Sequence, residues 1–253
     1  MMADVRKTEE AQELALAAEL QSALLPKQCP THCEHQVAAA KNRMSGSVGG
    51  DFYDFIRIND DQIALVIGDM VGHGVRASLL MANIMGWLRS SPANLSKPVR
   101  LMADLNLMLL DLWNRVGSPM PCSIFYMVID LPSGCAFFVN AGHPRPFLCD
   151  RDQCATFHLG ARNMLLGVQE FEPEEGCNEF TPGQRLVLYT DGIPDAMNRR
   201  GEQFGHERLS ELLNRSQDGT PESLTELVFN ELDKFRDGAG QLDDETIVVF
   251  DRI

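Results

Sequence analysis

The sequence is poor in basic residues, and this excludes one large class of partner. It contains 22 Lys and Arg against 36 Asp and Glu, which gives a net charge of -14 at pH 7. Such a surface repels nucleic acid phosphates, and no basic stripe offsets it, so we expect no nucleic acid partner. An acidic protein that acts on a phosphate must neutralise charge locally, and bound divalent cations can do this.

Long apolar runs are also missing. No run approaches the roughly 20 residues needed to cross a bilayer, so we expect no membrane span. The start, MMADVRKTEEAQ, lacks the apolar core of a signal peptide, which predicts a cytoplasmic protein. Seven cysteines, an odd number without a regular framework, fit reduced thiols in that compartment.

The sequence offers only a weak match to a zinc site. Cys29, His32, Cys33 and His35 lie close together. Their spacing matches no common structural zinc pattern, and nothing nearby completes a ligand set. We therefore predict an ordinary loop there.

The stretch from Ile63 to Gly74, IALVIGDMVGHG, is the most informative part of the chain. Its first residues are apolar on both faces, which predicts a strand that is covered on both sides. Asp69 stands where this strand ends, and a carboxylate there is costly unless a cation or donors meet it. Asp69 is therefore either a turn residue that caps the following helix or part of a metal or catalytic site.

Other acidic residues share this position at a boundary between strand and loop. Asp69 and Asp191 end predicted strands, whereas Asp51 and Asp243, with Asp244 beside it, begin them. In an antiparallel sheet the end of one strand lies beside the start of its neighbour, so all four sites are expected at one edge.

Gathered carboxylates repel one another unless cations are bound. Oxygen ligands without a matching His or Cys cluster indicate Mg²⁺ or Mn²⁺ rather than zinc. Two cations that share one carboxylate would activate water and hold a phosphate. The alternative stays open, because Asp is also a common turn residue.

The remaining pattern predicts mixed helices and antiparallel strands. Residues 7–25 read as a helix, and Ser96 is expected to cap a helix from Pro98. A Pro-Ser-Gly turn at 132–134 joins two apolar runs and predicts a hairpin. Two helices are expected at about 206–215 and 221–236, and a surface loop at 169–179. No linker divides the chain after residue 26, which gives a regulatory helix at 1–26 and one domain at 27–253.

Five motifs make the sequence similar to a known family. In chain order they are SVGGDFYDF, IGDMVGHG, NAGHPRP, LYTDGIPDAMN and DDETIVV. They resemble the PPM (type 2C) metal-dependent serine/threonine protein phosphatases, in the bacterial branch that is SpoIIE-like and RsbU-like. The resemblance implies an α+β fold, an αββα sandwich of two antiparallel β-sheets flanked by helices, with two Mn²⁺ or Mg²⁺ ions at one end.

The resemblance also implies roles for individual residues. Attack of metal-bridged water on phosphoserine or phosphothreonine is the implied reaction, without a phosphoenzyme. Asp69 would bridge both metals. Carried over by motif, the metal-binding and catalytic positions are Asp51, Asp69, Asp191 and Asp243, with the Met70 carbonyl as a further ligand and Asp244 ranked below Asp243.

The sequence departs from the branch at a few positions. Val71 stands where Ser is common, and Pro194 and Asp195 stand where Thr or Val and Glu are usual. None of these removes a proposed ligand. We do not transfer a general-acid role to His73, and we expect His143 to order its loop rather than to donate a proton. For Arg76 and Arg145 we expect surface ion pairs rather than contacts to a phosphate.

The implied partners follow from the same resemblance. The substrate would be a phosphorylated protein in bacterial signalling, such as a small anti-sigma-factor antagonist. An upstream sensory or receiver domain, or a separate regulator, would control the enzyme. The helix at 7–25 is the expected site of that coupling or of homodimerisation.

Two other functions were weighed. A non-catalytic relative would bind a phosphoprotein and serve as a scaffold, and loss of ligand carboxylates would favour it, but all four are present. A metal-dependent phosphodiesterase for small molecules would use similar two-metal chemistry, so only the resemblance argues against it.

Overall fold

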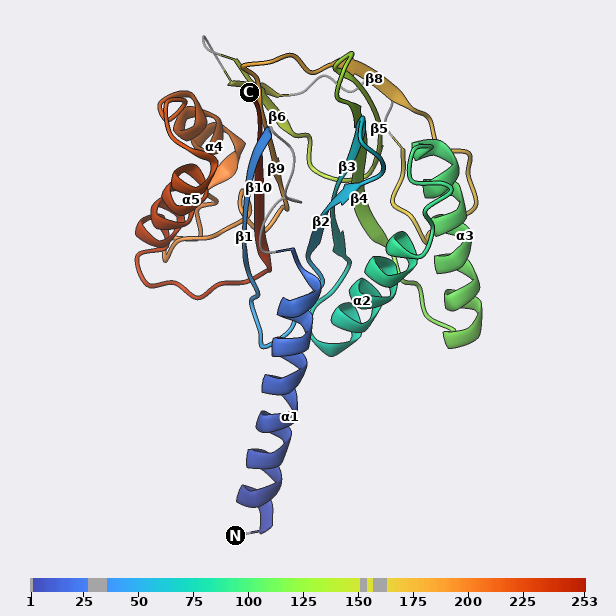
Figure 1. The fold of residues 1–253 in the computed structure, drawn as a ribbon. Helices are drawn as coiled ribbons and strands as arrows, with labels where there is room; N and C mark the ends of the chain where they lie inside the picture. The colour runs from blue at the N-terminus through green and yellow to red at the C-terminus, as the bar shows by residue number, and fades with distance from the viewer. Residues whose placement is uncertain (1, 27–35, 151–153, 157–162) are drawn as a thin grey trace.

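The computed structural model is a sandwich of two antiparallel β-sheets with helices on both outer faces (Figure 1). It describes residues 2–26, 36–150, 154–156 and 163–253. The predicted α+β sandwich is therefore confirmed. The Cys29 to His35 cluster lies outside the described residues, so the loop expected there stays a prediction.

The first sheet contains both ends of the main domain. Helices α4 (Gly205–Asn214) and α5 (Pro221–Arg236) cover its outer face, close to the two helices expected there. All neighbouring strands are antiparallel. Its strand order is β1 (Gln36–Arg43), β10 (Glu245–Arg252), β9 (Arg185–Tyr189), β6 (Phe147–Cys149) and β7 (Cys154–Thr156).

The second sheet is formed by the middle of the chain. Helices α2 (Val75–Arg89) and α3 (Pro98–Val116) pack on it. The hairpin predicted at 132–134 is confirmed, because it joins two antiparallel neighbours. The strand order is β2 (Phe52–Arg57), β3 (Gln62–Met70), β4 (Cys122–Asp130), β5 (Cys135–Ala141) and β8 (Gly176–Glu179).

Two expectations about local structure were wrong. Strand β8 lies in the segment expected to be a surface loop, where its main chain pairs with the edge of β5. Its sequence, GCNE, has little β propensity, so the pairing and not the side chains makes the strand. Lys97 rather than Ser96 is the N-cap residue of α3, and no side chain caps that helix end.

Alternation along the strands builds two apolar layers. In β9, Leu186 and Leu188 point into the core between the sheets, whereas Val187 and Tyr189 pack under α4 and α5. Strand β3 is buried along its length, and each residue from Ile63 to Ile67 is at most 1% exposed. The predicted strand with two covered faces is therefore confirmed.

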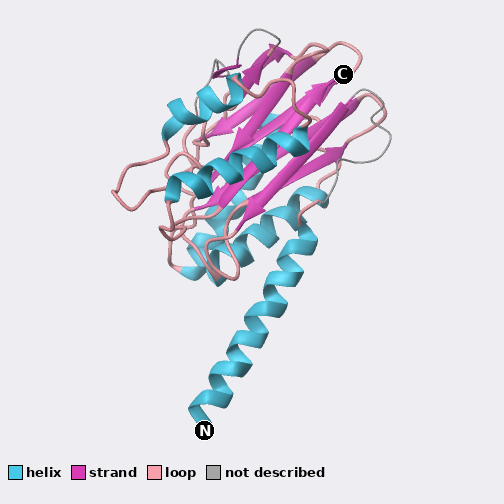
Figure 2. Ribbon diagram, turned by 90° about the vertical axis from the view of Figure 1, so that its left-hand side faces the viewer, coloured by secondary structure: helices cyan, strands magenta, loops and turns pink. Residues whose placement is uncertain are grey.

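Helix α1 (Met2–Leu24) projects away from the sandwich (Figures 1 and 2). Its C-terminal end packs beside α2, and the nearby Leu25 belongs to the core. Leu16 and Leu20 are exposed on the projecting part. Among the helices that the structure describes, none combines the length and the apolar character needed to cross a membrane.

The cysteines depart from the expectation of uniformly reduced thiols. Cys122, Cys135 and Cys177 are free, but Cys149 in strand β6 is disulfide-bonded. Their irregular spacing in the sequence carried no signal for this bond.

The core predicts a contrast between two neighbouring phenylalanines of β5. Phe138 is 1% exposed and stacks on Phe125, with ring centroids 5.8 Å apart, whereas Phe137 is 38% exposed. We expect Phe138→Ala to lower the free energy of unfolding by about 3–5 kcal/mol, because it leaves a cavity. Phe137→Ala is the matched control and should cost less than about 1.5 kcal/mol. Urea denaturation measures both, and equal losses would contradict the assignment of Phe138 to the core.

Candidate metal centre

The ends of four strands, two from each sheet, bring the predicted aspartates together. In the second sheet, Asp51 immediately precedes β2 and Asp69 is the penultimate residue of β3. These two positions are close together because their neighbours Phe52 and Gly68 pair. In the first sheet, Asp191 follows the end of β9 and Asp243 precedes the start of β10. These two strand ends are adjacent because Tyr189 pairs with Ile247.

The two pairs meet across the sandwich. Electrostatic repulsion from acidic side chains of both sheets raises the pKa of Asp69, namely from Asp51, Asp191, Asp243 and Asp244. The expectation of one edge of one sheet was therefore wrong in detail. The carboxylates lie at corresponding ends of two sheets, because packing the sheets face to face aligns the ends of their strands.

Asp51 is held by two hydroxyl groups that the sequence analysis did not single out. Asp51 is 1% exposed, and its Oδ2 accepts hydrogen bonds from Thr190 Oγ1 at 2.8 Å and Thr246 Oγ1 at 2.6 Å. Thr190 and Thr246 come from adjacent strand ends of the other sheet, so these bonds tie the two sheets together at the site. Asn42 Nδ2 donates to Thr246 Oγ1 in turn, at 2.6 Å.

Asp244 anchors the loop that leads to Asp51. Its Oδ1 accepts from the Ser45 main-chain nitrogen at 2.7 Å and from Ser45 Oγ at 3.0 Å. Its Oδ2 accepts from the Gly50 nitrogen at 2.7 Å. Because both oxygens already serve the loop, these contacts favour Asp243 over Asp244 as a ligand, as ranked from the sequence.

Glycines let the main chain approach the carboxylates closely. A Cβ atom on Gly50 would lie 2.9 Å from the Met70 carbonyl oxygen and 3.1 Å from Asp69 Oδ1. A Cβ on Gly192 would overlap the main chain of Asp244. Gly72 and Gly74 adopt positive φ angles of 103° and 76°, which allow the sharp turn between β3 and α2.

The environment makes ionisation of these carboxylates unfavourable. Burial, with repulsion from Asp244 and Asp191, raises the pKa of Asp51 to about 8 despite the two threonine hydrogen bonds. Burial and repulsion from the other four carboxylates raise the pKa of Asp69 to about 9. Burial, followed by repulsion from Asp243, raises the pKa of Asp191. Burial, with repulsion from Asp244 and Asp195, also raises the pKa of Asp243.

The protein supplies little positive charge to offset this repulsion. Within the described part of the chain, no Lys or Arg forms an ion pair with Asp51, Asp69, Asp191 or Asp243. His73 is exposed and lowers the pKa of Asp243, so it lies near that carboxylate.

The donor set still fits hard cations. Among the described residues, no three His, Cys, Asp or Glu side chains are already arranged around one point as metal ligands. Repelling carboxylates are not expected to converge without a cation between them. Their oxygen chemistry, their common location and the nearby Met70 carbonyl suit Mg²⁺ or Mn²⁺.

His143 orders the turn after β5, as expected. It is 5% exposed, and its Nδ1 lies 2.9 Å from Ser123 Oγ, on the residue that pairs with Asp69. The Asn140 side chain binds both the nitrogen and the carbonyl oxygen of His143. Burial lowers the pKa of His143 to about 3, although an interaction with the Tyr189 main chain opposes this. A buried, neutral imidazole is unsuited to donate a proton to a substrate.

The two arginines considered from the sequence make no surface ion pair among the described residues. Arg76 donates to Ser118 Oγ at 3.0 Å and to the Pro119 carbonyl at 2.8 Å. Arg145 is half-buried, and its Nε has no hydrogen-bond partner in the described part of the chain. The expectation of ion pairing was therefore wrong for both.

Helix α1 contacts the loop that carries Asp51. Gln21 is buried, its Nε2 donates to the Gly49 carbonyl at 2.7 Å, and its Oε1 accepts from the Gly49 nitrogen at 3.1 Å. A cavity of about 390 Å³ lies between the helix, at Leu14, and the loops that lead to the aspartates. Its other lining residues fall in 45–48, 73–75 and 241–242.

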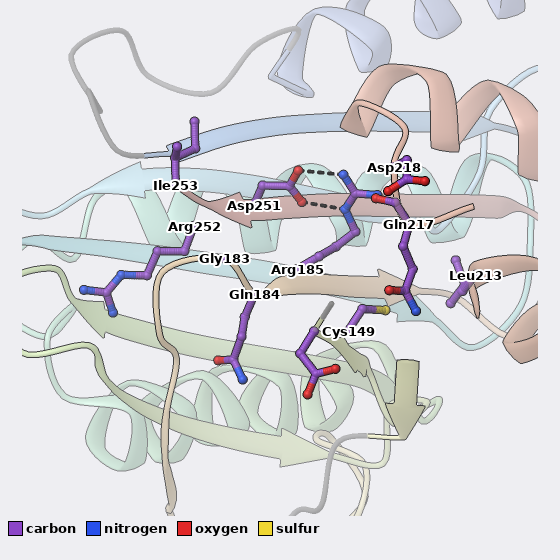
Figure 3. Close-up of a pocket in the computed structure, with 11 residues that line it drawn as sticks. Cys149, Gly183, Gln184, Arg185, Leu213, Gln217, Asp218, Asp251, Arg252 and Ile253 are labelled. Atoms are coloured by element: carbon purple, nitrogen blue, oxygen red, sulfur yellow. Dashed lines mark hydrogen bonds and ion pairs between the residues drawn. The ribbon is translucent and has the colours of Figure 1, made fainter. Parts of the chain in front are cut away.

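A second cavity, of about 440 Å³, lies at the opposite ends of β9 and β10 (Figure 3). Arg185 crosses it and binds Asp251 through two hydrogen bonds of 2.6 Å each. Arg185 also donates to the Gly219 carbonyl at 2.6 Å. Arg185 and Asp251 thus neutralise each other in this cavity, unlike the carboxylates of the aspartate cluster.

Comparison with known families identifies the domain. The family model described as stage II sporulation protein E (SpoIIE) matches residues 59–253, more than half of the chain. The chain belongs to the SpoIIE family. The resemblance expected from the five motifs is therefore confirmed.

Two curated relatives are longer than this chain. Protein IcfG of Synechocystis is 27% identical over 93% of this chain and 41% of its own length. Phosphoserine phosphatase RsbP of Bacillus subtilis is 26% identical over 82% of this chain and 50% of its own length. The chain thus spans half or less of these two SpoIIE-family relatives.

Solved structures share the fold. The SiaA-PP2C domain of Pseudomonas aeruginosa superposes with a TM-score of 0.84 at 20% identity and covers 100% of both chains. The catalytic domain of the serine/threonine phosphatase PstP, in complex with two manganese ions, has a TM-score of 0.66 at 14% identity. The PstP match covers 87% of this chain and 99% of PstP. At these identities the likeness establishes the fold alone.

The raised pKa values of Asp51 and Asp69 predict how the stability of the metal-free protein depends on pH. Between the ordinary value of 3.8 and about 8 or 9, the folded state holds more protons than the unfolded state. Its stability must therefore fall as pH rises through this range. Above pH 7 the buried His143 is neutral in both states and contributes little. We expect the melting temperature in EDTA to fall between about pH 7 and pH 8.5.

Asp69→Asn provides the control, because it removes one of the two ionisations and should flatten this slope. Excess Mg²⁺ should raise the melting temperature of the unmodified protein, and more so at the higher pH, because the cation competes with protons. A melting temperature in EDTA that rises across this range would contradict the assignment.

Proposed function

We propose that this chain is a metal-dependent protein-serine/threonine phosphatase, a phosphoric monoester hydrolase. The observation that carries the proposal is the meeting of four strand-end carboxylates from two sheets, which no Lys or Arg in the described part of the chain pairs. The naming of RsbP as a phosphoserine phosphatase supports the same reaction class.

Two Mn²⁺ or Mg²⁺ ions are proposed as the cofactor. Asp69 would bridge them, since it interacts with all the other acidic side chains of the cluster. PstP, which shares the fold, binds two manganese ions. The proposed ligands are Asp51, Asp69, Asp191, Asp243 and the Met70 carbonyl, with Asp244 retained mainly as the loop anchor.

The bound cations would supply Lewis-acid activation of water and of the phosphoryl group. The protein's own residues prepare the site for them. Thr190 and Thr246 orient Asp51 and leave its Oδ1 available. Asp51 and Asp69 give up their protons when the cations are held, which the raised pKa values make dependent on pH. His143 keeps the Ser123 strand in place beside Asp69.

The proposed substrate is a phosphorylated protein in a bacterial signalling pathway, with an anti-sigma-factor antagonist as the specific candidate. The greater length of IcfG and RsbP supports an upstream sensory domain or a separate regulator. The charge balance argues against nucleic acid. We retain the cytoplasm as the proposed location.

Residues 1–26 are proposed as the regulatory element and 27–253 as the phosphatase domain. Gln21 links the helix to Gly49, and Arg89 Nη2 donates to the Leu24 carbonyl at 3.0 Å. A shift of the helix would therefore move the loop before Asp51. Exposed Leu16 and Leu20 support homodimerisation through α1, which light scattering of the chain starting at Leu25 tests by a loss of mass.

The first prediction from this function concerns Asp191. Asp191→Asn should lower the hydrolysis of a phosphoserine protein in Mn²⁺ by more than about 100-fold, since it removes a proposed ligand. The unmodified protein should lose its activity in EDTA and regain it with Mn²⁺. Phosphate release measures both effects.

Asp218→Asn is the matched control, because this exposed carboxylate lies at the opposite end of the sheet and should not affect the rate. Full activity with the metal chelated would overturn the proposed mechanism. Full activity in Asp191→Asn would remove that residue from the ligand set.

The second prediction concerns the helix contact. Gln21→Ala should raise the Mn²⁺ concentration needed for half-maximal activity by about 10-fold, because the loop from Gly49 to Asp51 loses two hydrogen bonds. Ser22→Ala, at the exposed neighbouring position, is the control and should leave the metal dependence unchanged. Identical metal titrations for both variants would show that α1 does not act on the site.

A further inference from the structure

The chain that leaves Asp191 folds into a short hairpin beside the proposed metal centre. Met197 and Gln203 form an isolated antiparallel bridge that closes it. The Phe204 nitrogen donates to the Ala196 carbonyl at 2.8 Å. Ile193, Ala196 and Phe204 are buried, so the base of the hairpin is fixed in the core under α4 and α5.

Asn198 builds the tip of this hairpin. Its Oδ1 accepts hydrogen bonds from the main-chain nitrogens of Arg200, at 2.9 Å, and Glu202, at 3.0 Å. Its own nitrogen donates to the Glu202 carbonyl at 3.0 Å, and Gly201 takes a positive φ of 76°. Arg199 and Arg200 are therefore presented on a preformed turn, which reduces the entropy lost on binding.

The positive charges of Arg199 and Arg200 are not neutralised by any carboxylate of the described residues. Both are exposed, and neither lies within ion-pair distance of a carboxylate among the described residues. Most other arginines of the described residues are paired with carboxylates, as Arg89 is with Asp54 and Arg185 with Asp251. The tip thus carries two guanidinium groups that no carboxylate of the described residues pairs, while its own carboxylate, Glu202, accepts from Asn198 Nδ2 at 2.8 Å, on a protein of net charge -14.

Both arms around the tip connect to proposed metal ligands. At the hairpin base, Asp195 repels Asp191 and Asp243, and its Oδ1 accepts from Gln203 Nε2 at 3.1 Å. The Arg199 guanidinium lies against Gly238, where a Cβ atom would come within 2.5 Å of Nη2. Gly238 begins the segment that leads to Asp243.

The tip is close enough to touch a protein bound at the carboxylates. Arg199 is the fourth residue after Asp195, so at about 3.3 Å per residue the two are at most roughly 13 Å apart. A standard protein interface covers about 800 Å² on each partner, a patch wider than this distance. A phosphoprotein seated at the metal centre would therefore extend over the tip.

We propose that Arg199 and Arg200 form a docking contact for acidic residues that flank the phosphoserine of a phosphoprotein substrate. The proposal rests on the proposed phosphatase function and specifies its substrate class. Long-range repulsion between this protein and an acidic substrate makes a local cationic contact valuable, because complementary charges steer association and fix its orientation. Guanidinium groups also suit carboxylate partners by geometry.

The test compares two phosphoserine peptides of equal length, one with acidic flanks and one with neutral flanks. In Mn²⁺, the unmodified protein should show a higher kcat/KM for the acidic peptide. The double variant Arg199→Ala with Arg200→Ala should lose roughly 3- to 10-fold of kcat/KM on that peptide, mainly through KM. Hydrolysis of the neutral peptide should change little, and added salt should abolish the difference between the proteins.

A charge-matched control separates docking from net charge. Arg100→Ala with Arg115→Ala removes the same charge from exposed positions on α3. This variant should keep the preference for the acidic peptide. An equal loss in both double variants, or an equal loss on both peptides, would overturn the docking role.

A binding arm distinguishes failure of docking from failure of the phosphatase function. Fluorescence anisotropy of each labelled peptide in EDTA requires no turnover. If the unmodified protein hydrolyses neither peptide but binds the acidic one through the two arginines, the proposed phosphatase function fails and the docking contact stands. If the double variant binds the acidic peptide as tightly as the unmodified protein, the docking contact is overturned.

Discussion

Repulsion among carboxylates at the ends of two sheets is the constraint on which the rest of the structure depends. Asp51 and Asp69 are held where burial and their neighbours oppose ionisation, as their pKa values of about 8 and 9 show. A folded chain tolerates this only if the rest of the core is strong enough. The largely buried strands β3 and β4 supply that stability directly behind the site.

Hydroxyls and main-chain amides connect the two sheets at the constrained carboxylates. Thr190 and Thr246 extend from strand ends of one sheet to Asp51 of the other. In the opposite direction, the Asp244 carboxylate accepts hydrogen bonds from the main-chain nitrogens of Ser45 and Gly50. The two sheets are thus joined by reciprocal polar contacts as well as by apolar packing. A disturbance of either loop therefore reaches the proposed ligands of both sheets.

Much of this arrangement follows from the sequence, and the remainder has identifiable physical causes. The apolar runs before Asp69 and Asp191 predict strands because they report burial directly. The pairing of β8 was not predictable from GCNE, because an edge strand is held by the main chain of its neighbour. Thr190 and Thr246 were missed although Thr190 directly precedes Asp191 and Thr246 lies two residues after Asp244. A hydroxyl beside a proposed ligand was the available signal, but its partner Asp51 is distant in the chain.

The two ends of strands β9 and β10 differ in how their charges are balanced. At the far end, Arg185 and Asp251 are both largely buried, and each neutralises the other through two short hydrogen bonds (Figure 3). At the near end, the same strands lead to Asp191 and Asp243. Among the described residues, no Lys or Arg forms an ion pair with either carboxylate. Replacing these carboxylates by neutral residues would relieve the repulsion, so their clustering serves function rather than stability. A divalent cation is the economical counter-charge, because it adds two positive charges without the space that two arginine side chains would occupy.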